Sequence, residues 1–206
     1  MPIAKVVARE PIELDRRILK RLKDETAAAH RRVDTLIDLP RLGSDRYRRV
    51  IGGMCEAHRV VERELAPHGD TLARVGYDAR ARLQLTWLET DLAALGIRIS
   101  HDFEPGAYRL GDAAAAFGAV YVTEGATLGG QIIARHVMPR LSLSASNGCR
   151  YFTGYGTTTG EHWRATGLAL ARYASLGGDD LSHRIVAGAL DTFGLFESAL
   201  QAHDVT

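Results

Sequence analysis

A long helical pattern at about residues 112–138 contains four glycines, and no other feature of the sequence limits the fold as strongly. Each glycine inside a helix weakens it by about 1 kcal/mol relative to alanine, so four of them need a reason. One reason is close packing against a neighbouring helix. The other is a bent helix whose bare backbone lies against a flat ligand. The glycines are Gly118, Gly125, Gly129 and Gly130, and the pattern is expected to end before Pro139.

Composition is that of an ordinary globular chain. The 206 residues suit one domain, and the hydrophobic (46%) and charged (25%) fractions are typical of soluble proteins. No apolar run reaches the ~18 residues of a membrane helix, and the first ten residues show no signal-peptide pattern. The net charge of +1 indicates no affinity for nucleic acid, although residues 1–50 carry 13 Lys or Arg against 8 Asp or Glu. Cys55 and Cys149 form no CxxC motif, so we expect buried thiols and a cytoplasmic protein.

Apolar periodicity predicts an all-α chain. Residues 1–12 lack periodicity and are expected to be a flexible N-terminal arm, with one domain at residues 13–206. Steps of three and four predict helices at about 14–37, 45–65, 78–95, 112–138 and 177–203, and another that starts near residue 160. The inward faces of the second and last of these helices are expected to be Tyr47, Val50, Ile51, Met54, His58 and Val61, and Ile185, Val186, Ala189, Phe193 and Phe196.

The first helix places a histidine on its apolar stripe. His30 is expected to face inward, with the small residues at positions 27–29 leaving room beside the imidazole. The whole stripe reads Leu19, Leu22, Thr26, His30, Val33 and Ile37. A lone histidine on such a stripe is usually a hydrogen-bonded core residue, so spacing alone leaves its role open.

Three stretches resemble one known family. The run Glu124-Gly-Ala-Thr-Leu-Gly-Gly-Gln131 is similar to the distal helix of haem oxygenases, most closely the bacterial type associated with bacteriophytochromes. Residues 22–30 resemble the family's first-helix motif, and residues 150–164 resemble its Tyr/Phe-rich turn and following helix. The resemblance spans about residues 14–200. It implies an all-α, single-domain haem-oxygenase-like multi-helix bundle, with haem between the first helix and the glycine-rich distal helix.

The resemblance also implies a set of site residues. His30 would be the axial ligand of the haem iron, and Glu25 or a backbone carbonyl would hold its other ring nitrogen. The haem face would lie against Gly125, Gly129 and Gly130. Further contacts would come from Lys23 and Arg164 to the propionates, and from Tyr121 and Phe193 to the macrocycle, although solvation of Lys23 and core packing of Phe193 are alternatives.

The distal helix departs from the better-known eukaryotic pattern. Ala126 stands where many haem oxygenases carry an acidic residue that anchors water. Thr127 and Gln131 are candidates for supporting ordered water instead, with local helix hydrogen bonding as the alternative. Glu124 is expected outside the haem cavity, because a charge buried beside iron would be costly.

The implied function is haem oxygenase activity: cleavage of haem to biliverdin with release of iron and carbon monoxide. Haem would be both substrate and cofactor, with O2 and an external electron donor such as a ferredoxin or reductase, because no flavin or nucleotide motif is evident. The biliverdin could supply a bacteriophytochrome, or the reaction could recover iron. No nucleic-acid or membrane partner is expected.

Three alternatives stay open. The first is a non-catalytic haem-binding or storage protein, which Ala126 favours. The second is the same helical fold with other chemistry, but di-iron sites use Glu-x-x-His motifs, which the sequence lacks, and Cys55 and Cys149 lack the setting that thiamin-type hydrolysis requires. The third is a purely structural helical protein.

Overall fold

The computed structural model describes residues 17–99 and 103–204, and these residues form helices, short turns and connections without a strand. The helices are α1 (Arg17–Ile37), α2 (Ser44–Leu65), α3 (Gly69–Arg74), α4 (Leu85–Leu95), α5 (Ala113–Leu141), α6 (Arg150–Thr153), α7 (Thr159–Ala174) and α8 (Gly178–Asp204). The predicted all-α class is therefore confirmed. The expected N-terminal arm lies outside the described residues. None of the described helices is long and apolar enough to cross a membrane.

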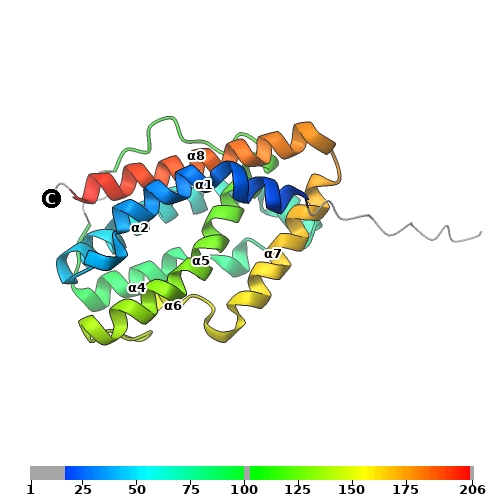
Figure 1. Cartoon of the computed structure of the whole chain (residues 1–206). Coiled ribbons are helices and arrows are strands. Elements are labelled where there is room, and N and C mark those ends of the chain that lie inside the picture. The colour runs from blue at the N-terminus through cyan, green and yellow to red at the C-terminus, as the bar shows by residue number, and fades with distance from the viewer. Residues whose placement is uncertain (1–16, 100–102, 205–206) are drawn as a thin grey trace, which may run out of the picture.

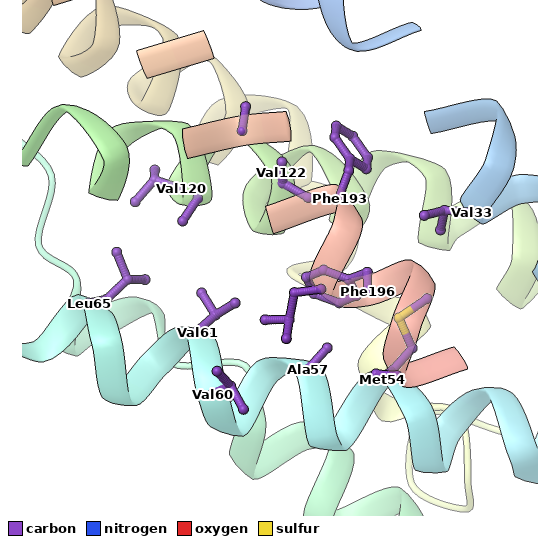
Figure 2. Packing of buried hydrophobic residues seen from close by; sticks show 14 of the residues in the cluster. Val33, Met54, Ala57, Val60, Val61, Leu65, Val120, Val122, Phe193 and Phe196 are labelled. Atoms are coloured by element: carbon purple, nitrogen blue, oxygen red, sulfur yellow. The ribbon is translucent and has the colours of Figure 1, made fainter. Parts of the chain in front are cut away.

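α8 packs along α5, α2 and α1, and Figure 1 shows it running beside α1 along one edge of the bundle. Figure 2 shows the core between these helices, where Phe193 and Phe196 of α8 lie among the valines of α2 and α5. Every residue expected on the inward faces of α2 and α8 is buried. The apolar pattern of these two helices thus specifies the core correctly.

α5 and α8 cross with their backbones in contact. A Cβ atom at Gly118 would lie 2.3 Å from the Ala189 nitrogen and the Ile185 oxygen, and one at Gly188 would lie 2.4 Å from the Cα of Ala115. No side chain fits in either place. Close helix packing therefore explains Gly118, the first of the four glycines in α5.

Two helix boundaries differ from the sequence prediction. α4 starts at Leu85 rather than near residue 78, because Asp78 accepts hydrogen bonds from the N–H groups of Arg80 and Ala81 and holds them in a turn. α5 does not end before Pro139 but continues to Leu141. A proline removes one hydrogen bond from a helix, and α5 ends soon afterwards at Ser142, whose φ is 55°.

Candidate functional site

A cavity of about 990 Å³ lies between the second half of α1 and the glycine-rich part of α5. Its walls are mainly apolar and include Val33, Met54, Val122, Phe152 and Phe196. Leu128 and Ile132 line it as well and are exposed, so the cavity reaches solvent on the α5 side. A volume of this size is at the upper end of the range for small-molecule and cofactor sites.

His30 lines this cavity from α1. Its side chain is 59% exposed, and the buried position of this turn belongs to Ala29, so the expectation that His30 lies on the buried stripe is wrong by one residue. On a helix of 3.6 residues per turn, an apolar stripe with steps of three and four residues is compatible with a buried side chain at either position 29 or position 30. The edge of the imidazole approaches the ring of Phe193 with 5.7 Å between centroids.

Asp34, one turn further along α1, fixes the imidazole. Its Oδ2 lies 2.8 Å from Nδ1 of His30, and this hydrogen bond raises the pKa of the histidine against the opposing effect of partial burial. Glu25, the partner expected from the sequence, instead accepts a hydrogen bond from Arg21 at 2.6 Å. In the neutral imidazole, donation of Nδ1–H to Asp34 leaves the lone pair on Nε2, as in histidines that bind metals.

Gly125, Gly129 and Gly130 line the cavity opposite α1. A Cβ atom at Gly129 would meet nothing within 4 Å, and one at Gly125 would meet only the ring of Trp163, at 3.6 Å. At Gly130 a Cβ atom would lie 3.1 Å from the carbonyl oxygen of Phe152. Gly125 and Gly129 therefore leave open space in the cavity, whereas Gly130 also permits close packing against α6.

Thr127 and Gln131 do not line the cavity. Thr127 is buried, and its hydroxyl donates to the carbonyl of Glu124 at 2.6 Å, which is the local hydrogen bond considered as its alternative role. Nε2 of Gln131 donates to the carbonyl of Gly156 at 2.8 Å and to the hydroxyl of Thr159 at 2.9 Å. Both side chains point to the segment that precedes α7, so a role in distal water stays a prediction.

The four expected cofactor contacts divide into two pairs. Tyr121 and Phe193 line the cavity. Lys23 and Arg164 are exposed and are not among its lining residues, and Nε of Arg164 donates to the carbonyl of Gly160 at 3.1 Å. Their contact with propionates stays a prediction.

Sequence reasoning missed two arginines of the cavity wall. Arg31 and Arg41 both line the cavity, beside Asp34 and Asp38. Arg31 directly follows His30, which was a usable signal, whereas Arg41 reaches the cavity only because the chain turns after α1. The wall therefore contains cationic groups that can pair with anionic groups of a ligand.

Glu124 does not line the cavity, as expected, but it is fully buried. Its carboxylate accepts hydrogen bonds from the hydroxyls of Tyr77 (3.1 Å) and Tyr155 (2.9 Å), and Nη1 of Arg82 lies 3.2 Å away. Burial and the neighbouring Glu124 carboxylate raise the pKa of Tyr77, so this phenol stays protonated and remains a donor. The buried charge is thus paired and hydrogen-bonded, as stability requires.

Comparison with known proteins gives one family and one fold. The family model described as heme oxygenase matches residues 16–202. The solved structure of the NO- and CO-bound heme oxygenase from Neisseria meningitidis superposes with a TM-score of 0.76 at 22% identity, covering 90% of this chain and 91% of that chain. Heme oxygenase 2 from Chlamydomonas reinhardtii, solved without heme, superposes with a TM-score of 0.68 at 17% identity, covering 90% of this chain and 96% of that chain. No curated protein matches the sequence.

Proposed function

Since this chain belongs to the haem oxygenase family, we propose that it binds haem in the cavity between α1 and α5 and cleaves it to biliverdin, with release of iron and carbon monoxide. The proposal rests on one observation: His30 of α1 and the side-chain-free positions Gly125 and Gly129 of α5 line opposite walls of the same apolar cavity. The similarity of fold agrees with this proposal.

The residues of the cavity fit a haem group. His30 offers Nε2 to the iron, since its Nδ1 is held by a carboxylate. On the opposite wall, Gly125 and Gly129 carry no side chain and leave space for the face of a macrocycle. Arg31 and Arg41 offer guanidinium groups to the haem carboxylates. When bound, haem supplies the iron chemistry that uses O2 and electrons.

The protein's own contribution is to hold the ligand, to orient it and to cover part of its surface. The aliphatic and aromatic side chains of the walls keep water from the parts of a bound ligand that they cover, which strengthens the polar contacts there. Among the described residues of the α5 wall there is no carboxylate, and Ala126 lies at the position where many relatives carry one. Protons must therefore enter this side of the cavity through water.

The remaining partners are those that the resemblance to the family implies. The reaction requires electrons from a ferredoxin or reductase, and we place its docking on the basic face of α1. Part of that face is already neutralised, because Arg21 pairs with Glu25 and Asp179, and Arg32 pairs with Glu197. The biliverdin would serve a bacteriophytochrome, or the reaction would release iron for reuse, inside the cytoplasm.

A second candidate function is haem binding without turnover, which Ala126 favours because no carboxylate organises water at that wall. One experiment separates the two functions. The haemin complex is reduced under oxygen, and its absorption spectrum is followed together with carbon monoxide release. Conversion of the Soret band into biliverdin absorbance supports the oxygenase. A haem spectrum that persists through repeated reduction supports storage instead.

A further inference from the structure

The glycine-rich part of α5 has two different faces. Glu124, Thr127 and Gln131 follow one another at spacings of three and four residues, which places them on one side of the helix. None of the three lines the cavity, whereas Gly125 and Gly129 do. A polar stripe therefore runs along the back of the backbone that faces the cavity.

Both ends of this stripe are attached to the segment that leads into α7 or to the first residue of α7. At one end, Glu124 accepts a hydrogen bond from the hydroxyl of Tyr155 at 2.9 Å. At the other end, Gln131 donates to the carbonyl of Gly156 at 2.8 Å and to the hydroxyl of Thr159 at 2.9 Å. The attachments thus enclose the cavity-facing glycines between them.

Arg82 connects the same helix to the neighbouring wall. Its Nη1 lies 3.2 Å from Oε2 of Glu124, 3.3 Å from the carbonyl oxygen of His162 and 3.1 Å from the hydroxyl oxygen of Thr166. The last two groups belong to α7, whose Trp163 lines the cavity and faces Gly125. One guanidinium group therefore fixes the spacing of two cavity walls.

The glycine backbone needs such support. Glycines lower helix stability, and on the cavity side no atom lies within 4 Å of where a Cβ of Gly129 would be. We propose that Arg82, Glu124 and Gln131 are positioning residues that hold the backbone of residues 125–130 against α7, so that the cavity is preformed for a flat macrocyclic ligand. The identity of that ligand as haem rests on the proposed function.

The test compares variants of this support with a matched control in the same helix. Arg82→Met removes all three hydrogen bonds of the guanidinium group, and Gln131→Met removes the second attachment at a half-buried position. The control is Asp112→Ala, which removes the cap of α5, an acceptor for the N–H of Ala115 at 2.8 Å, far from the cavity. Amide hydrogen exchange without haemin and haemin titration are measured on each protein.

We expect faster exchange at residues 125–130 and about tenfold weaker haemin binding in both Met variants, the size expected when a contact that supports a binding group is lost. The control should leave both quantities near the wild-type values even when it lowers the melting temperature. Equal effects of control and Met variants, or unchanged exchange in Gln131→Met, would overturn the inference. If the wild type takes up no haemin, the proposed function fails, while the exchange data still decide whether these residues position the backbone.

Discussion

The glycines of α5 have two separate roles, and two alanine variants test this division. Gly129→Ala adds a methyl group that meets nothing within 4 Å. The substitution therefore keeps the gain in helix propensity of about 1 kcal/mol and should raise the free energy of unfolding by up to that amount. Gly118→Ala places its methyl group 2.3 Å from the backbone of α8, which cannot move aside as a side chain could.

At Gly118 the free-energy cost of overpacking exceeds the gain in helix propensity. Overpacking of this kind costs about 1–3 kcal/mol or more, and contact with backbone puts this case at the upper end. After the propensity gain is subtracted, Gly118→Ala should lower the free energy of unfolding by about 2 kcal/mol. Urea unfolding of both variants, without haemin, measures the two effects directly.

The same positions should differ in ligand binding. Gly129→Leu projects a side chain into the cavity, so it should fold normally and lose haemin binding, whereas Gly118→Ala should lose stability and retain binding when folded. If Gly129→Ala destabilised the protein by more than about 1 kcal/mol, or if Gly118→Ala were neutral, the assignment of one glycine to the cavity and the other to packing would be refuted.

Three further results are expected. Asp34→Asn removes the hydrogen bond that raises the pKa of His30, so an NMR titration should show a lower pKa for this imidazole, and an unchanged value would contradict the pairing. A raised histidine pKa stabilises the fold below about pH 6.5, and this contribution is lost as the pH rises through the folded-state pKa. The difference in free energy of unfolding between wild type and variant should therefore be larger at pH 6 than at pH 9. It should stay below about 1 kcal/mol, because both side chains of the pair are exposed. Burial raises the pKa of Cys55 to about 11, so iodoacetamide at pH 8 should alkylate this thiol in urea but not in the folded protein, and rapid alkylation of the native chain would refute its burial. Replacing Arg31 and Arg41 together by glutamine should weaken haemin binding by about tenfold, as measured by titration, and unchanged affinity would exclude them as carboxylate partners.

The long helices were predictable because their apolar patterns repeat over many turns. All the residues expected on the inward faces of α2 and α8 are buried, from Tyr47 to Phe196. Local hydrogen bonding was harder to predict. Asp78 replaces a helical turn with a capped loop, and α5 continues past Pro139 because one missing N–H does not end a well-packed helix.

The candidate site was predictable only where one helix supplies the information. His30 and the glycine-rich segment do line one cavity, yet the sequence could not separate Gly118 from Gly129, because that depends on how closely α8 approaches. The environment of Glu124 depends on tyrosines and an arginine far away in the sequence. The one signal in the sequence for this buried environment was the presence of the Glu124 carboxylate in an otherwise apolar segment.

The central claim is that His30 and the glycine-rich part of α5 hold haem between them, and a haemin titration followed by absorption tests it most directly. The wild type should take up haemin stoichiometrically and give the spectrum of an imidazole-ligated haem, and His30→Ala should lose that spectrum. Failure of the wild type to saturate, or an identical spectrum in the variant, would contradict the claim.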